Sequence, residues 1–283
     1  MCLPRKCPVC NVSPSVKPTI ETESTAADFY ASSVRLMQDA GIPFLVGGAY
    51  ALRQYTGIVR DTKDFDVFIR EADLERALLL FRDAGYRADI TYAHWLAKVH
   101  YGEAFIDLIF RAGNGLCEVG DDWFRDTTSV NLLGSVVDLV RPEDMISQKC
   151  YIMERERYDG ADIAHLLRFC AEELNWDYLI SRFGPDWRVL LAHLVMFGFI
   201  YPAERARIPD VVLKNLLDRL HQESSANDNS GKICQGTLIS RAQYLPDIER
   251  WGYRDARLEG RAKISADEIE AWTNAIGKER AWA

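Results

Sequence analysis

The stretch Asp64-Phe65-Asp66-Val67-Phe68-Ile69 limits the possible folds more than any other part of the chain, because polar and apolar residues alternate in it. Alternation with a period of two predicts an extended strand, on which residues i and i+2 point to the same face. Asp64 and Asp66 would then lie side by side, with the apolar residues of the strand packed behind them. Two neighbouring carboxylates repel each other. A divalent cation that prefers hard oxygen ligands, such as Mg²⁺, would remove this conflict.

A pair of glycines lies between an expected strand and an expected helix. The buried strand Phe44–Val46 ends at Gly47 and Gly48, and the helix Ala49–Tyr55 begins directly after them. Glycine lets a phosphate group approach the backbone, and the first turn of a helix offers free N–H groups and the positive end of its dipole. The same junction also occurs as an ordinary tight turn, so the glycines alone leave both interpretations open.

A third aspartate lies inside another apolar strand. Asp107 is the single charged residue in Phe105-Ile106-Asp107-Leu108-Ile109-Phe110. A lone buried carboxylate is costly unless it is paired or bound to a metal. Three aspartates, two from one strand and one from a neighbour, could hold one or two Mg²⁺ ions against a triphosphate. The alternative for Asp64 and Asp66 is an exposed strand face with two solvated charges.

Taken in order, Val46-Gly47-Gly48, Asp64-Phe65-Asp66 and Asp107 resemble the motifs of the nucleotidyltransferase superfamily, with its DNA polymerase β-like fold, and a small bacterial-type member in particular. The resemblance covers roughly residues 26–175. It implies that Asp64 and Asp66 are catalytic metal ligands and that Asp107 is a further ligand or the general base. It also implies that Gly47 and Gly48 cradle the triphosphate. Two Mg²⁺ ions are implied, with Mn²⁺ as an alternative, and ATP is the expected nucleotide.

Several basic residues near these motifs are further candidates for nucleotide binding. Arg60 and Lys63 flank the acidic strand and could contact phosphate or only balance nearby acids. Lys149 follows a stretch that resembles a helix facing the nucleotide in small members of the superfamily, and the alternative is a solvated charge. The gap between the glycines and the acidic strand is fifteen residues, slightly more than usual, and we place the excess at Tyr55–Ile58.

The residues that follow Lys149 have a plainer interpretation. Arg155 and Arg157 are expected to be solvated charges. Asp159-Gly160-Ala161-Asp162 is expected to be a turn that supplies the N-cap of the next helix.

The order of the elements favours an α+β fold, a nucleotidyltransferase-like mixed β-sheet with flanking helices followed by a helical C-terminal region. Strands are expected at 44–46, 64–70, 86–91, 97–101, 104–110, 130–133 and 136–140. Helices are expected at 28–40, 49–55, 72–84, 143–157, 161–174, 186–197, 209–221 and 266–276. The expected organisation is a flexible arm (1–24), a nucleotidyltransferase catalytic domain (25–141), a helical substrate-side region (142–222), a linker (223–232) and a small helical C-terminal segment (233–283).

Composition excludes some classes of function. The net charge of −8 argues against a broad nucleic-acid-binding surface. We expect no stretch with the apolar length of a membrane span, and the N-terminus lacks the apolar core of a signal peptide. Seven cysteines favour reduced thiols in the cytoplasm over a disulfide framework. The spacing of Cys2, Cys7 and Cys10 could hold a metal, but a fourth nearby ligand is missing.

The sequence therefore favours an enzyme that moves a nucleoside monophosphate from a nucleoside triphosphate to an acceptor hydroxyl and releases pyrophosphate. One alternative is a catalytically silent antitoxin-like or regulatory binding protein with the same fold. Another is an antibiotic-adenylylating enzyme. The acceptor, the preferred base, the oligomeric state and the role of residues 233–283 stay open.

Overall fold

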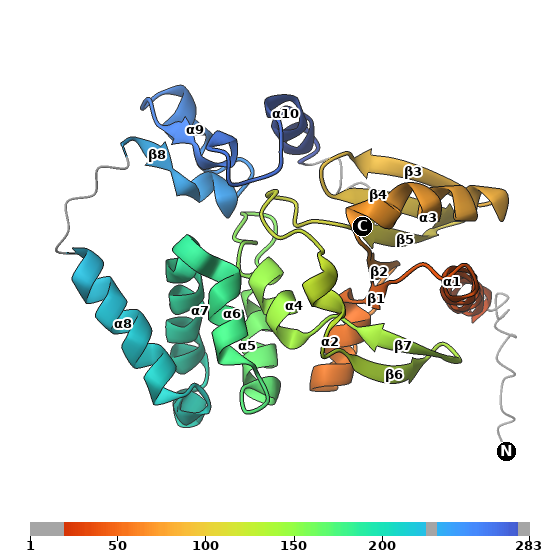
Figure 1. Ribbon diagram of the computed structural model, residues 1–283, viewed down its shortest axis with the longest axis horizontal. Coiled ribbons are helices and arrows are strands. Elements are labelled where there is room, and N and C mark those ends of the chain that lie inside the picture. Colours follow the sequence, from red (N-terminus) through yellow and green to blue (C-terminus); the bar gives the residue numbers. More distant parts are fainter. Residues whose placement is uncertain (1–19, 225–230, 277–283) are drawn as a thin grey trace, which may run out of the picture.

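A seven-stranded mixed sheet forms the N-terminal half of the molecule in the computed structural model, which describes residues 20–224 and 231–276 (Figure 1). The strand order is β3-β4-β5-β2-β1-β7-β6. The strands are β1 (Leu45–Val46), β2 (Asp64–Phe68), β3 (Arg87–Tyr92), β4 (Leu96–Tyr101), β5 (Ala104–Ile109), β6 (Thr128–Leu132) and β7 (Ser135–Leu139). The expected α+β class is confirmed.

The acidic strand β2 lies in the interior of this sheet. It pairs with β1 in antiparallel register and with β5 in parallel register. Phe65 and Val67 of β2 are buried, as are Ile106 and Leu108 of β5, so both strands place alternate apolar residues in the core. This alternation is the physical reason why both strands could be predicted from their sequence.

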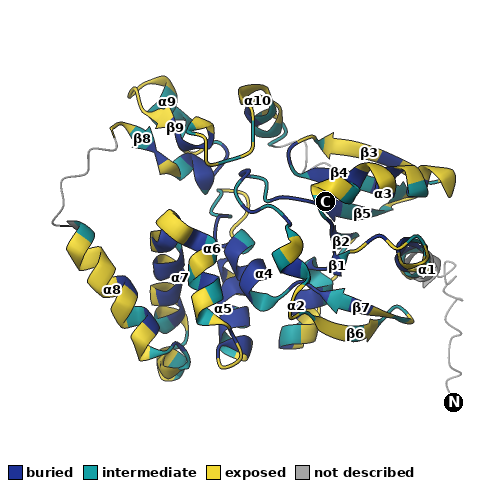
Figure 2. Ribbon diagram, in the orientation of Figure 1, coloured by how far each residue is buried: buried dark blue, intermediate teal, exposed yellow. Residues whose placement is uncertain are grey.

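Some helices flank the sheet, and others form a separate layer, coloured from green to cyan in Figure 1. The helices of the sheet region are α1 (Ile20–Asp39), α2 (Gly48–Thr56) and α3 (Glu71–Asp83). The helical region contains α4 (Pro142–Lys149), α5 (Gly160–Cys170), α6 (Trp176–Phe183), α7 (Trp187–Ile200) and α8 (Asp210–Ser224). Figure 2 shows that α4 lies mostly buried between the sheet and the other helices, whereas much of α8 is exposed. Short 3₁₀ turns connect these elements at η1 (Asp121–Phe124), η2 (Gly184–Asp186) and η3 (Pro202–Arg207).

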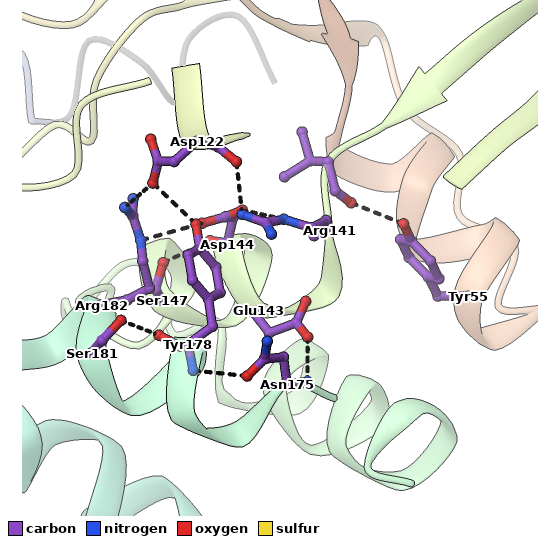
Figure 3. A network of polar contacts seen from close by, with 11 residues as sticks. Tyr55, Asp122, Arg141, Glu143, Asp144, Ser147, Asn175, Tyr178, Ser181 and Arg182 are labelled. Carbon is purple, nitrogen blue, oxygen red and sulfur yellow. Dashed lines mark hydrogen bonds and ion pairs between the residues drawn. The ribbon is translucent and has the colours of Figure 1, made fainter. Parts of the chain in front are cut away.

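A buried polar network joins α4 to α6 and η1 (Figure 3). At its centre is the Asp144 carboxylate, whose side chain is fully buried. Arg141 lies 3.1 Å from one carboxylate oxygen, and Arg182 lies 3.2 Å from the other. The Tyr178 hydroxyl donates to Asp144 at 2.9 Å, and Arg182 also pairs with Asp122 at 3.0 Å. Two arginines therefore compensate one buried charge at the joint between the sheet region and the helices.

The C-terminal segment, residues 231–276, bridges the sheet region and the helical region. It contains β8 (Ile233–Cys234), η4 (Gln235–Leu238), α9 (Leu245–Glu249), β9 (Arg254–Asp255), η5 (Ala256–Leu258) and α10 (Ala266–Asn274). On the sheet side, Asn114 donates to the Leu238 carbonyl at 3.0 Å and the Lys263 N–H donates to the Gly115 carbonyl at 2.8 Å. Besides the helical pieces of the small helical segment expected at 233–283, it holds the parallel pair β8–β9.

On the helical side, the same segment holds the loop that follows α4. The Met153 N–H donates to the Ile239 carbonyl at 3.0 Å, and Arg241 forms an ion pair with Glu154 at 2.8 Å. The helix expected over 143–157 was therefore too long, because it ends at Lys149. The N–H groups of residues 150–152 still donate to carbonyls three or four residues back, but the Met153 N–H donates instead to Ile239, about ninety residues further along the chain.

Other boundaries also differ from expectation. Helix α6 was not expected. Its N-cap Asn175 accepts a hydrogen bond from the Tyr178 N–H, and asparagine is a preferred residue at the start of a helix. Helix α1 begins at Ile20, inside the range 1–24 expected to be an arm, and residues 1–19 with Cys2, Cys7 and Cys10 lie outside the described residues. Within the expected linker 223–232, residues 225–230 also lie outside them.

One segment corrects the expectation about membrane spans. By length and composition alone, Trp176–Ile200 is long and apolar enough to cross a membrane. Such a finding for one helical stretch is weak, because a core helix passes the same test. This stretch comprises α6, η2 and α7, and its buried residues include Leu179, Trp187 and Leu190.

Candidate metal centre

The three aspartates predicted from the sequence lie together on neighbouring strands. Asp64 and Asp66 are on β2 and Asp107 is on β5, directly beside Asp66 in the parallel register. Each of the three offers a carboxylate oxygen, and these oxygens all lie within 4.8 Å of one another. The side chains are partly buried. Alternation along both strands thus turns all three acids to one face of the sheet.

The two glycines lie against this acidic cluster. The Gly47 N–H donates to the Asp66 carbonyl at 3.0 Å, which ties the start of α2 to the acidic strand. Gly48 has a φ of +54°, and a Cβ added there would overlap the Asp66 carboxylate. Glycine at position 48 is therefore required by both the backbone conformation and the approach of Asp66. The first turn of α2 consequently begins beside the carboxylates.

The charges of the cluster are not fully compensated within the chain. Burial, followed by repulsion from Asp64 and Asp107, raises the pKa of Asp66 to about 7. Burial also raises the pKa of Asp107, although the neighbouring Lys98 ammonium opposes this shift. A buried carboxylate next to two others binds a proton more readily because its negative charge is poorly solvated. A bound cation would relieve the same strain.

Lys98 is a member of this centre that the sequence prediction missed. Its Nζ lies 2.5 Å from Oδ1 of Asp107, and Lys98 is directly opposite Asp107 in the antiparallel pairing of β4 with β5. The strands expected at 97–101 and 104–110 contain the signal, because Lys98 and Asp107 lie at equal distances from the two residues between these strands. Residues placed in this way face each other across an antiparallel pair.

A second charged cluster, between α4 and α5, contains two of the predicted phosphate-binding residues. Lys149 Nζ lies 2.7 Å from Asp159 and 2.8 Å from Asp162. Arg60 is paired with Asp162, and Arg157 with Asp159 at 2.9 Å. Lys149 and Arg157 both act electrostatically on Asp66, so this cluster lies near the acidic centre. Asp159 occupies the N-cap position of α5 as expected. Its carboxylate pairs with Lys149 and Arg157, however, and makes no cap hydrogen bond.

Lys63, the remaining predicted residue, is exposed immediately before β2, and its carbonyl accepts a hydrogen bond from the Tyr30 hydroxyl at 2.9 Å. Between Arg60 and Lys63, the Thr62 hydroxyl donates to the Asp64 carboxylate. Helix α2 continues to Thr56 and ends at the left-handed Gly57, so Tyr55 and Thr56 of the range Tyr55–Ile58 belong to the helix and the loop before β2 begins at Gly57. Arg157 was expected to be solvated, and 63% of its side chain is exposed despite its ion pair.

This donor set suits a divalent cation with a preference for oxygen. Three carboxylates that converge from one face repel one another, and the raised pKa of Asp66 reflects first its burial and then that repulsion. Mg²⁺ and Mn²⁺ bind carboxylate oxygens, whereas softer metals prefer the nitrogen and sulfur ligands of His and Cys. The cluster contains neither His nor Cys. The arrangement can therefore hold a hard cation next to a helix start that suits phosphate.

Comparison with solved structures gives nucleotidyltransferase-like neighbours of low similarity. An antigenic nucleotidyltransferase-like protein from Paracoccidioides brasiliensis is 16% identical, with a TM-score of 0.39, over 65% of this chain and 92% of that one. A putative nucleotidyltransferase from H. pylori is 16% identical, with a TM-score of 0.35, over 74% and 99%. The lincosamide antibiotic adenylyltransferase LnuA, bound to lincomycin, is 15% identical, with a TM-score of 0.36, over 50% and 94%. At such low similarity we conclude nothing from them about substrate or activity.

Comparison by sequence is more decisive. No curated protein matches the chain. Residues 25–185, more than half of the 283, match a protein family described as "uncharacterised nucleotidyltransferase". This span contains the glycines, the three aspartates and Lys149, and the resemblance seen in the sequence is thereby confirmed: the chain belongs to this nucleotidyltransferase family.

Proposed function

We propose that the protein transfers a nucleoside monophosphate from a nucleoside triphosphate to an acceptor hydroxyl, with ATP as the expected donor. The observation that supports this most directly is the convergence of Asp64, Asp66 and Asp107 within 4.8 Å on one face of the sheet. The glycine turn at the start of α2 adjoins them. Carboxylates beside a phosphate-binding helix start are the parts that a metal-assisted phosphoryl transfer needs.

The proposed step exchanges one bond to phosphorus for another. The oxygen of the acceptor hydroxyl bonds to the α-phosphorus while the bond from that phosphorus to the bridging oxygen of pyrophosphate breaks. The hydroxyl proton passes to Asp107, or to a water molecule if Asp107 acts as a metal ligand; Lys98 occupies the other oxygen of Asp107. Divalent cations held by Asp64, Asp66 and Asp107 would neutralise the charge that develops on the phosphates. The pyrophosphate leaves with the electron pair of the broken bond.

The chain's own groups would hold the nucleotide. The N–H groups at the start of α2 point out of the glycine turn and favour an anion. Arg60, Lys63 and Lys149 remain candidates for phosphate contact. Two of these, Arg60 and Lys149, are paired with Asp162, so they would have to share or exchange that partner when phosphate binds.

A binding protein without catalysis is the alternative that the site favours less. A cluster of three repelling carboxylates lowers stability unless a cation is bound, so a pure interaction module would gain from losing it.

The described cysteines Cys117, Cys150, Cys170 and Cys234 are buried and free, which supports a reducing compartment such as the cytoplasm.

The test is transfer of radiolabel from α-labelled ATP, GTP, CTP and UTP to pools of small molecules, proteins and tRNA with Mg²⁺. We expect the double variant Asp64→Asn with Asp66→Asn to lose labelling by about a hundredfold or more, because both ligands become neutral. Asp218→Asn, on the exposed face of α8, is the matched control and should label like the wild type. Labelling that persists undiminished in the double variant would refute the mechanism.

A binding measurement covers the case in which the acceptor is missing from every pool. Each nucleotide should raise the melting temperature of the wild type only when Mg²⁺ is present. The double variant should show no such Mg²⁺-dependent shift. An equal shift in both proteins would also contradict the proposal.

A further inference from the structure

Lys98 supplies a fixed positive charge inside the acidic centre. Its side chain is 22% exposed and that of Asp107 is 13% exposed, so the ion pair is largely shielded from water. The ammonium also lies 3.9 Å from the centre of the Phe105 ring, on the strand that carries Asp107. Two independent contacts, one to a carboxylate and one to an aromatic face, therefore hold Lys98 in place.

The position of this charge matters because Asp107 belongs to the acidic cluster and also pairs with Lys98. Asp107 lies beside Asp66 in the parallel register and opposite Lys98 in the antiparallel register. One of its oxygens is taken by the ammonium, which leaves the other for a cation. Any divalent cation at the cluster must therefore bind next to a resident monovalent cation and be repelled by it.

We propose that Lys98 is a built-in counter-ion that holds Asp107 in place and weakens the affinity of the centre for free divalent metal. The inference rests on the proposed function, because it takes Asp64, Asp66 and Asp107 as metal ligands. Two effects of removing Lys98 oppose each other. Asp107 would become less ordered, but the repulsion of the incoming cation would disappear, and the second effect is larger.

The magnitudes decide between these effects. Even at the dielectric constant of water, a divalent ion and an ammonium that share one carboxylate repel enough to change a binding constant about tenfold, and more where water is excluded. If the Asp107 side chain gains rotamer freedom, the entropy cost of fixing it again changes the binding constant only by a few-fold. The centre would thus hold metal firmly only when a triphosphate brings further negative charge, which links metal binding to nucleotide binding.

The experiment measures Mn²⁺ binding to the full chain without nucleotide, by the electron paramagnetic resonance signal of free Mn²⁺. Lys98→Met should bind Mn²⁺ about tenfold more tightly than the wild type, and Lys98→Gln should do the same. Lys98→Arg keeps the charge and should stay within about twofold of the wild type. Lys214→Met removes one charge from the exposed face of α8 and should change nothing.

The outcomes separate the two proposals. If Lys98→Met and Lys98→Gln are folded by circular dichroism and bind Mn²⁺ no more tightly than the wild type, the role of Lys98 is refuted. If only one of them folds, that variant decides. Mn²⁺ binding that is unchanged in Asp64→Asn with Asp66→Asn would instead refute the metal centre and the proposed function, whatever Lys98 does.

Discussion

Gly48 meets two requirements that no residue with a side chain can meet. Its φ of +54° lies in the left-handed region, and the position of its missing Cβ is occupied by the Asp66 carboxylate. The acidic cluster at this place therefore depends on the absence of a side chain as much as on the presence of three acids. The conformation alone would already favour glycine, and the contact with Asp66 excludes the other residue types.

Gly48→Ala should consequently lower the free energy of unfolding by about 2–4 kcal/mol, because backbone strain and overlap add. Gly57→Ala is the matched control, since Gly57 also has a positive φ, +72°, but nothing lies within 4 Å of an added Cβ. That change should cost only about 1 kcal/mol. Urea denaturation of both variants tests the difference, and equal losses would show that the approach of Asp66 is not a constraint.

The raised pKa of Asp66 predicts that the stability of the metal-free protein depends on pH. Its pKa is raised from 3.8 to about 7, mainly by burial and by Asp64. Between pH 3.8 and about pH 7, the Asp66 carboxyl is protonated in the folded chain and ionised in the unfolded chain. The stabilising contribution is therefore complete below pH 3.8 and is lost as the pH rises through about 7.

The expected loss from Asp66 between pH 5 and pH 8 is at most a few kcal/mol, because each tenfold difference in proton affinity between the folded and unfolded chain corresponds to about 1.4 kcal/mol. Denaturant titrations in EDTA at the two pH values measure it. Asp66→Asn cannot ionise, so it should lose less stability over this interval and be more stable than the wild type at pH 8. Identical pH dependence in the two proteins would contradict this explanation of the raised pKa.

At the scale of single elements, local patterns predicted the strands that carry the site. Alternation along β2 and β5 is a property of neighbouring residues, so both strands and the direction of Asp64, Asp66 and Asp107 could be predicted. The loop after α4 could not be predicted in this way. Its helical spacing is overridden by Arg241, which binds Glu154 from a distant part of the chain.

The buried Asp144 carboxylate joins helix α4 to helix α6 through its ion pair with Arg182. Asp144→Ala would leave the partly buried Arg141 without its carboxylate partner, and Arg182 with Asp122 alone. We expect a loss of about 3–5 kcal/mol in the free energy of unfolding, since breaking a buried pair from one side leaves an uncompensated charge. Asp83→Ala, at the exposed end of α3, should stay within about 0.5 kcal/mol of the wild type. Similar stability of both variants would show that the network does not join the two regions.

At the scale of the whole molecule, residues 231–276 lie outside the family match and contact two regions inside it. The match ends at residue 185, yet the segment beyond it contacts Asn114 and Gly115 on the sheet side and Met153 and Glu154 on the helical side. The loop that contains Glu154 continues to Arg157 and Asp159, next to the acidic centre. No local pattern in the segment indicates this position, because its partners lie far away in the chain.

The ion pair between Arg241 and Glu154 should therefore control the order of a loop that lies next to the acidic centre. Each side chain is only 10% exposed, and Arg241 donates to both carboxylate oxygens, at 2.8 and 2.9 Å. Arg241→Met should raise the rate of amide hydrogen exchange in residues 150–159 by about tenfold or more, because Glu154 would lose its ion-pair partner and keep only the hydrogen bond from the backbone N–H at position 241. The exposed Arg250→Met is the control and should leave the exchange of this loop unchanged. Unchanged protection of residues 150–159 in Arg241→Met would mean that the loop keeps its place without the C-terminal segment.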